Sequence, residues 1–470
     1  MSEFSEKLES YLGRNGHNTA SFAKLCGIER TVFYKYEKGK RLPQNLETVE
    51  EIADKLLLAV DEKMELIRLW NMERIGKEAF LQREGVKELL ENLNEYTSFH
   101  MDSSQFVINC GISDDKTVYI AKSEIELQMY IRNILKYEAL KEKFEVRMCM
   151  QPRYHFLLEA LLEYSEYPAL SVTQLVCFHK QKDTIVNNLK YLKEILPMAF
   201  CLPDYKLKVY YEHAEHHINS MSVLPNIILT GEFVILFSYG GKEGIIYRER
   251  EIYGFYSELY ENMSKQCKCI STNCGTVEEY MNSIMNKNFM YFINQNPCFG
   301  IGFTREFLDK MLIQEIPDRD ALIENIISDI ERRTVEYEKH ACEAFFTKKG
   351  VVQFMKTGRD NEYPPELYRQ LTEAESRELI QSLCDSRTLF YVHNRLFDDM
   401  KFHYESDVII HIEIGGGVIF QKPDGQFRRK FVTLEESSIN EMFVDFFENL
   451  DKMQYIKSEE ETIEYLRSLL

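Results

Sequence analysis

The chain lacks the segments that would export it or fix it in a membrane. It begins with Met1, Ser2 and Glu3, without the basic start and apolar core of an export signal. Its most apolar window, 227–239, is too short to span a bilayer and contains Glu232. The 11 cysteines are an odd number scattered along 470 residues, which favours reduced thiols over a disulfide framework. We therefore expect a cytoplasmic protein without membrane contact.

Familiar patterns of metal-binding and catalytic residues are missing as well. Two clusters could supply metal ligands but lack the spacing of known zinc modules: Cys267-x-Cys269-x4-Cys274 with Cys298, and His213-x2-His216-His217 with Glu212 and Glu215. We interpret both as loops. The run Gly415–Gly417 lies between two expected strands and predicts a hairpin turn instead of a phosphate-binding loop. We expect no metal, no cofactor and no enzymatic activity.

One segment is similar to a catalytic motif but departs from it. Residues 393–399, His-Asn-Arg-Leu-Phe-Asp-Asp, are similar to the His-x-Lys-x4-Asp motif of phospholipase D-like nucleases. Arg395 stands in place of the lysine, and Asp398 and Asp399 follow at a different spacing. These departures argue against a mechanism that passes through a phosphohistidine.

The composition is that of a packed protein with an acidic surface. Hydrophobic residues make up 44% of the chain, which includes 30 Phe and 28 Tyr, and this excludes general disorder. A length of 470 residues predicts two or three folding units. The net charge of −19 excludes a protein that coats nucleic acid with its whole surface, so any contact with DNA has to be local.

Residues 1–60 carry the pattern of four short helices. Apolar side chains recur at helical spacing in the first helix, and Asn18 or Thr19 can cap the second. A third helix is expected over about 30–38, because a glycine follows it, and Asn45 can cap the fourth. We therefore predict a small helical domain at this end of the chain.

The middle of this region, 23–43, has a characteristic order of residues. A small side chain can let two helices approach, a glycine can supply the positive φ of a turn, apolar residues can anchor the helix that follows, and a Glu-x-Gly-Lys-x-x-Pro ending completes the pattern. These places are filled by Ala23, Gly27, Ile28, Phe33, Tyr36, Glu37, Gly39, Lys40, Arg41 and Pro43. The pattern resembles the helix-turn-helix of the Xre/Cro family of DNA-binding regulators, and the resemblance covers about residues 4–58.

The resemblance implies that the third helix enters the major groove of a DNA duplex. The candidate DNA-binding residues are Thr19, Arg30, Thr31, Tyr34, Lys35, Lys38, Lys40 and Arg41. Arg30 and Lys35 can donate to guanine, Thr31 can contact a thymine methyl group or a phosphate, and Tyr34 can contact sugar or phosphate. The three basic residues after the helix are expected to neutralise phosphates, and Thr19 begins a helix whose first amides can bind one.

The distribution of charge favours DNA contact by the candidate DNA-binding residues. Residues 1–58 contain nine basic and nine acidic residues, but five basic residues fall within 30–41 against Glu37 alone. A helix-turn-helix retained as a protein-interaction module is the alternative interpretation.

The rest of the chain has a different pattern of apolar and polar residues. The pattern stays helical over 61–97, which predicts a helical connector that is either packed on the next domain or used for dimerisation. Beyond it, short β-like runs alternate with amphipathic helices and predict one α/β effector or assembly domain over 98–275 and a second α/β section over 276–470. The expected fold class is an all-α helix-turn-helix head followed by a mixed α/β C-terminal region.

Three local expectations bear on the details of that region. The runs 107–110 and 117–120 predict a hairpin, and 320–346 predicts one long helix. No internal repeat is evident in the sequence.

These features favour a sequence-specific transcriptional regulator that binds double-stranded DNA as a homodimer and senses a small-molecule or protein effector through its C-terminal region. One alternative is an enzyme that uses the helix-turn-helix for targeting, which would require acidic or histidine side chains converging in a pocket. The other is an antitoxin-like scaffold, which would present a large exposed apolar patch instead.

Overall fold

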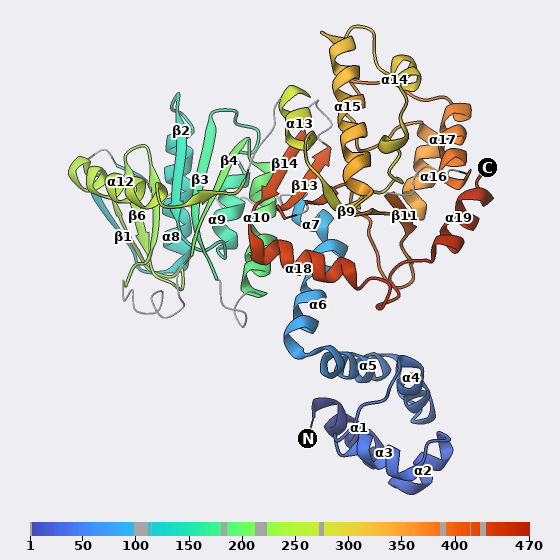
Figure 1. The fold of residues 1–470 in the computed structure, drawn as a ribbon. Helices are drawn as coiled ribbons and strands as arrows, with labels where there is room; N and C mark the ends of the chain where they lie inside the picture. The colour runs from blue at the N-terminus through green and yellow to red at the C-terminus, as the bar shows by residue number, and fades with distance from the viewer. Residues whose placement is uncertain are drawn as a thin grey trace. The chain divides into compact units, whose positions relative to one another are not determined.

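The computed structural model describes residues 2–97, 111–113, 115–179, 186–211, 223–271, 277–385, 392–413, 415–423 and 429–470 (Figure 1). The chain divides into two compact units, Met1–Gly85 and Val86–Leu470. The division falls within the segment 61–97, which the sequence predicts to be a connector. In the described part of the chain, no helix is long and apolar enough to cross a membrane.

The first unit contains five helices and the first part of a sixth. They are α1 (Glu3–Arg14), α2 (Thr19–Leu25), α3 (Arg30–Glu37), α4 (Leu46–Lys55), α5 (Val60–Ile75) and α6 (Lys77–Glu91). Asn18 and Asn45 cap α2 and α4 by accepting hydrogen bonds from backbone amides three residues later. The apolar faces of α1 to α5 meet in one core, which includes Phe4, Leu8, Phe22, Phe33, Ile52 and Trp70.

Helix α5 is an integral part of this core. The indole Nε1 of Trp70 donates to the carbonyl oxygen of Pro43 at 2.9 Å, and the Trp70 side chain is buried. Glu73 accepts from the backbone amide of Phe4 at 2.8 Å, which joins α5 to the start of α1. Lys7 and Glu65 add an ion pair at 2.8 Å between the same two helices. The fold around α3 therefore depends on residues beyond 60.

The second unit begins with the end of α6 and with α7 (Leu93–Thr97). Val86, Leu89, Leu90 and Leu93 are fully buried and belong to the same hydrophobic core as the strands that follow. The last part of the predicted connector therefore packs within the α/β unit.

The predicted fold class, an all-α helix-turn-helix head followed by a mixed α/β region, was wrong. The described chain is mixed α/β, with 18 α-helices distributed along its length and two sheets of eight and six strands. Helical periodicity identifies the buried face of a helix but not the element that covers it. The continuous helical pattern up to Thr97 therefore suggested a separate all-helical part, although α7 belongs to the α/β core.

The first sheet has the order β1-β7-β6-β5-β2-β3-β4-β8. Its strands are β1 (Val118–Ala121), β2 (Phe144–Cys149), β3 (Leu170–Phe178), β4 (Asp204–Tyr211), β5 (Asn226–Thr230), β6 (Phe233–Phe237), β7 (Gly244–Tyr247) and β8 (Lys268–Cys269). One face packs on α8 (Glu124–Glu138), α9 (His155–Leu162) and α10 (Val186–Cys201), and the other on α12 (Arg250–Ser264). Both faces are thus covered by helices.

The second sheet has the order β11-β10-β9-β12-β13-β14. Its strands are β9 (Phe289–Ile293), β10 (Cys342–Phe346), β11 (Val392–Leu396), β12 (Ile409–Glu413), β13 (Val418–Pro423) and β14 (Arg429–Leu434). Its helices are α13 (Val277–Ile284), α14 (Arg305–Met311), α15 (Arg319–Tyr337), α16 (Lys348–Thr357), α17 (Glu373–Asp385), α18 (Ser437–Glu448) and α19 (Glu459–Ser468). Helix α18 packs on β12 and β13, and α13 and α15 contribute to the core on the opposite face.

The two sheets share one topology, which the sequence did not predict. In each sheet, three parallel strands that follow one another in the chain, β2-β3-β4 or β9-β10-β11, lie side by side. The next three strands add in antiparallel order beside the first of them, and the following helix, α12 or α18, covers these added strands. Such a repeat needs only the same succession of apolar elements, so no residue pattern has to recur.

Strand β10 corrects the predicted helix over 320–346. Helix α15 ends at Tyr337, and the chain then turns into β10, whose two neighbours are both parallel to it. A central parallel strand is a short continuous apolar run, which hydrophobic periodicity alone does not distinguish from the last turn of a buried helix.

Two turn predictions have different outcomes. The predicted turn at Gly415–Gly417 is confirmed, because β12 and β13 pair in antiparallel fashion on either side of it. In the predicted hairpin, β1 pairs with β7, and its expected partner 107–110 lies outside the described residues.

Candidate nucleic-acid interface

Helices α2 and α3 are joined by a short turn with one positive φ angle. Gly27 has φ +64°, and the amide of Ile28 donates to the carbonyl oxygen of Ala23 at 2.9 Å, which closes the end of α2. Ala23 is buried, so its small side chain allows the helices to lie close together. Glu29 then precedes α3 without a side-chain cap.

Aromatic side chains fix α3 against the rest of the unit. The rings of Phe22 and Phe33 lie 5.4 Å apart, and those of Phe33 and Tyr36 lie 6.4 Å apart. All three rings are buried, as expected for the anchoring side of the helix. The exposed residues of α3 lie on the other side of the helix from these rings.

The predicted base-contacting residues lie on that outer face. Arg30, Thr31, Tyr34 and Lys35 are exposed, and Tyr34 keeps 47% of its surface accessible although it is a large ring. Lys40 and Arg41 are exposed in the loop after α3. Within the described residues, the four cations of this face form no ion pair, so their charges are available to phosphates and base edges. They are Arg30, Lys35, Lys40 and Arg41.

Two other residues predicted to contact DNA, Lys38 and Thr19, bind carboxylates within the first unit. The Lys38 ammonium lies 2.7 Å from Glu9 and 3.4 Å from Glu37, and its hydrogen bond with Glu9 raises the pKa of Lys38. The Thr19 hydroxyl donates to Glu37 at 2.6 Å. These contacts join α1, α2 and α3 around the buried Glu37 carboxylate. A phosphate contact by either residue stays a prediction, and for Lys38 it competes with Glu9.

Sequence reasoning missed one charged residue on this face. Glu29 is exposed directly before Arg30, and its carboxylate accepts a hydrogen bond from the Thr31 hydroxyl. A carboxylate at the first turn of a helix is electrostatically favourable there but opposes a nearby phosphate. Its place in the helix-turn-helix pattern could have identified it, since it immediately precedes the predicted base reader.

Gly39 is required for the loop that follows α3. It has φ +65°, and a Cβ atom added there would lie 2.8 Å from the Ser5 hydroxyl and 3.2 Å from the Ser2 amide. Gly27 has nearly the same φ, +64°, but nothing lies within 4 Å of an added Cβ. A comparison of alanine substitutions at the two glycines therefore separates the cost of backbone strain from the cost of steric contact.

We expect Gly39→Ala to destabilise the first unit by about 1–2 kcal/mol more than Gly27→Ala, because both variants strain the backbone but only the first also crowds α1. The chain contains a single tryptophan, Trp70, which lies in this unit. Urea unfolding followed by its fluorescence would measure the difference in the intact protein. Equal losses of stability would show that the contact with Ser5 and Ser2 has no energetic weight.

The other clusters singled out in the sequence do not form a site in the described structure. Within the described residues, no group of three or more His, Cys, Asp or Glu side chains could hold a metal ion. Cys274 and the cluster 212–217 lie outside those residues. His393 lies in β11 and is 3.7 Å from Glu459, Arg395 pairs with Asp451 at 2.7 Å, and Asp398 pairs with Lys457 at 2.8 Å.

Comparison with known proteins leaves the family open. No model of a protein family matches the chain, and no curated protein matches it in sequence. The structural matches include TrmBL2, an archaeal chromatin protein with a novel mode of DNA binding (11% identity, 45% of this chain, 71% of that one, TM-score 0.22). They also include polyphosphate kinase from Porphyromonas gingivalis (11% identity, 70% of this chain, 50% of that one, TM-score 0.22). A third is phosphatidylserine synthase from Haemophilus influenzae Rd KW20 (9% identity, 82% of this chain, 97% of that one, TM-score 0.22). Likenesses of this strength carry no argument about function.

Proposed function

We propose that the protein is a sequence-specific DNA-binding transcriptional regulator that works as a homodimer in the cytoplasm. The observation that carries the proposal is the outer face of α3, where Arg30, Thr31, Tyr34 and Lys35 are exposed while Phe33 and Tyr36 anchor the same helix. A helix with a fixed inner face and a polar, basic outer face suits insertion into a major groove.

The chemistry of these side chains assigns each a part in recognition. The guanidinium of Arg30 can donate two hydrogen bonds to the O6 and N7 atoms of one guanine, which makes it the main base reader. Lys35 can donate to a neighbouring guanine, and the Thr31 methyl group can contact that of a thymine. Lys40 and Arg41, beyond the end of the helix, neutralise phosphates and contribute affinity without sequence preference.

The homodimer follows from the weakness of one such contact. A single helix-turn-helix reads about half a helical turn, and the chain as a whole carries a charge of −19. Two linked copies that reach two half-sites bind far more tightly than either does alone, because the second contact becomes intramolecular. The C-terminal region is then available for assembly and for sensing an effector.

We expect Arg30→Ala and Lys35→Ala each to weaken binding of the specific duplex by about 1–3 kcal/mol and to reduce discrimination against a scrambled duplex. Lys40→Ala should weaken the binding of both duplexes alike, because a phosphate contact carries no sequence information. Gel-shift titrations at constant salt measure both effects.

Lys55→Ala is the matched control, since Lys55 is an exposed cation at the end of α4, next to the acidic residues of that helix. It should bind both duplexes like the unaltered protein. If Arg30→Ala behaves like Lys55→Ala, α3 is not the recognition helix.

A further inference from the structure

Helix α12 carries apolar side chains that stay exposed among the described residues. The helix lies over β5 and β6 of the first sheet, with Tyr260 and Ser264 buried beneath it (Figure 1). Away from these contacts, Phe255 is 64% exposed, and Leu259, one turn further on, is 40% exposed. Ile252, one turn before Phe255, is partly buried. Because residues three and four apart share one side of a helix, these three side chains form an apolar stripe along α12.

The apolar stripe lies on the side of α12 that is next to β7 and β1. On the opposite side, Arg147 of β2 donates to the hydroxyl groups of Tyr253 at 2.9 Å and of Ser257 at 3.1 Å. Tyr256 instead packs in the same core as Tyr247 of β7 and lies close enough to interact with it electrostatically. Tyr256 is one turn away from two members of the stripe, so the stripe is on the β7 side.

The strands next to the stripe continue the apolar surface. Val118 and Ile120 of β1 pair with alternate residues of β7, and the partner of Val118 is Tyr247. Tyr247 packs in the core beneath α12, whereas Tyr119 is buried in the core on the opposite face of the sheet. Val118 and Ile120 therefore lie on the α12 face, and both are exposed. We call these two residues and the apolar stripe the α12 patch.

The equivalent helix of the second sheet is covered on two sides. Helix α18 follows the added strands of the second sheet as α12 follows those of the first. It packs on its own sheet and on α10 of the first sheet, and Asn188 of α10 donates to the Ser438 hydroxyl at 3.1 Å. Phe443 and Phe446 of α18 are consequently fully buried. Within the described residues α12 has no such second cover, so another molecule can supply it.

The charges beside the α12 patch have opposite signs on its two sides. Glu251 and Glu258 are exposed on α12, each one turn from Phe255. Lys116 and Lys122 are exposed at the two ends of β1. Within the described residues, none of these four side chains forms an ion pair. A twofold axis through the patch would bring the acidic side of each copy to the basic side of the other, which favours a second copy of this chain as the partner.

We propose that the α12 patch is the homodimer interface, in which the apolar stripes of two copies pack antiparallel and each α12 lies over β7 and β1 of the other copy. The inference rests on the proposed function, because it assigns a surface to the homodimer proposed there. The interface belongs entirely to the second unit. It therefore links two DNA-binding units without using any residue of α3.

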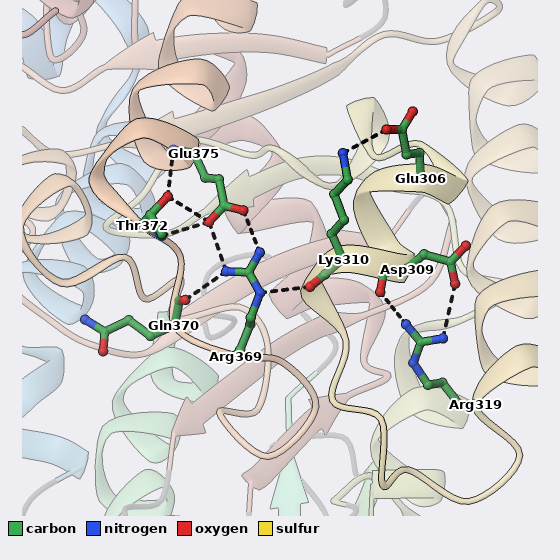
Figure 2. A network of polar contacts seen from close by, with 8 residues as sticks. All are labelled: Glu306, Asp309, Lys310, Arg319, Arg369, Gln370, Thr372 and Glu375. Atoms are coloured by element: carbon green, nitrogen blue, oxygen red, sulfur yellow. Dashed lines mark hydrogen bonds and ion pairs between the residues drawn. The ribbon is translucent and has the colours of Figure 1, made fainter.

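The second half of this unit provides a surface for the control. Around α14 and α17 the charged side chains bind one another within the chain (Figure 2). Arg369 donates to the two carboxylate oxygens of Glu375 at 2.9 Å and 2.5 Å, and Arg319 of α15 pairs with Asp309 of α14 at 3.1 Å. Val335, also on α15, is 57% exposed but lies among polar residues. It is therefore a matched control for Phe255.

The test is the oligomeric state of the full-length protein in the absence of DNA. Light scattering and sedimentation of the unaltered protein should show a dimer of the 55.7 kDa chain. Phe255→Glu should raise the dissociation constant of the dimer by roughly 100-fold or more, because it places a charge in the middle of an apolar interface. Val335→Glu should leave the dimer unchanged. Both side chains are largely exposed within one chain, so circular dichroism should show that both variants fold.

A dimer that persists unchanged in Phe255→Glu would place the interface elsewhere and overturn this inference, while the proposed homodimer would stand. A monomeric unaltered protein would contradict both the interface and the homodimer. Neither result depends on whether α3 reads DNA, which the gel shifts test separately.

Charge reversal tests whether the partner is a second copy of the same patch. Changing Glu251 and Glu258 to Lys should weaken the dimer, and so should changing Lys116 and Lys122 to Glu, because each pair of changes places like charges opposite one another. All four changes together should restore the dimer, since the two sides again carry opposite charges. A fourfold variant that dimerises no better than the two double variants would overturn the twofold arrangement.

Discussion

A chain that ends after Gly85 should bind the specific duplex roughly 10²- to 10⁴-fold more weakly than the full-length protein, because it would lose the linkage between the two DNA-binding units of the proposed homodimer. The fragment retains the core that positions α3, including Trp70 and the other α5 residues. Its contacts with a single half-site should therefore persist, and Arg30→Ala should still weaken them. What disappears is the intramolecular second contact.

Size and affinity have to be measured together for this prediction. Light scattering of the full-length protein should give twice the chain mass of 55.7 kDa, and the fragment should be monomeric. Far-UV circular dichroism of the fragment should show that its helices remain. A monomeric full-length protein, or a folded fragment with undiminished affinity, would contradict the dimer.

Trp70→Ala should destabilise the first unit by about 3–5 kcal/mol, the usual cost of removing a large buried aromatic side chain. Trp70 is 2% exposed, packs among helices of the first unit, and donates from Nε1 to Pro43 in the chain that follows α3. Its loss should therefore disturb the loop that carries Lys40 and Arg41. Urea unfolding of the 1–85 fragment, followed by circular dichroism, measures the change.

Trp70→Phe serves as the control because it keeps most of the buried ring and removes the hydrogen bond. It should cost about 1–2 kcal/mol, the value of a buried carbonyl left without its partner. If Trp70→Ala cost no more than Trp70→Phe, α5 would contribute little to the core, and a fragment ending near residue 60 would suffice.

The helices around α3 could be predicted because short-range signals define them. Asn18 and Asn45 cap helices where expected, Gly27 and Gly39 have positive φ, and Phe33 is buried. These features depend on residues within a few positions of one another. The role of α5 could not be predicted in the same way, since its contacts join Trp70 to a residue 27 positions away.

In the α/β part too, contacts between residues far apart in the chain could not be predicted from the sequence. From the sequence, apolar runs bounded by turns predict strands over 227–229, 233–237 and 244–247, and these ranges lie close to β5, β6 and β7. The pairing of β2 with β5, across the intervening β3 and β4, and the shared topology of the two sheets involve residues far apart in the chain. One sequence contains no signal for such partners.

For the candidate interface, residue type and spacing predicted which side chains are exposed. They did not predict which of the basic side chains pair with carboxylates of the protein itself. Arg30, Thr31, Tyr34 and Lys35 face solvent as expected. The contact of Lys38 with Glu9 joins the end of α3 to α1, over a separation that helical periodicity does not address. A charge count in the sequence treats Lys38 and Lys40 alike, whereas in the described structure Lys38 pairs with Glu9 and Glu37 and Lys40 forms no ion pair.

Selection from a pool of random DNA duplexes with the full-length protein tests the central proposal most directly. After several rounds, sequencing should reveal one enriched motif made of two related half-sites, with centres about one helical turn (10–10.5 base pairs) apart. Arg30→Ala in the same selection should lose preference at a guanine in each half-site. A pool that shows no enriched sequence after binding to the folded full-length protein would contradict sequence-specific recognition.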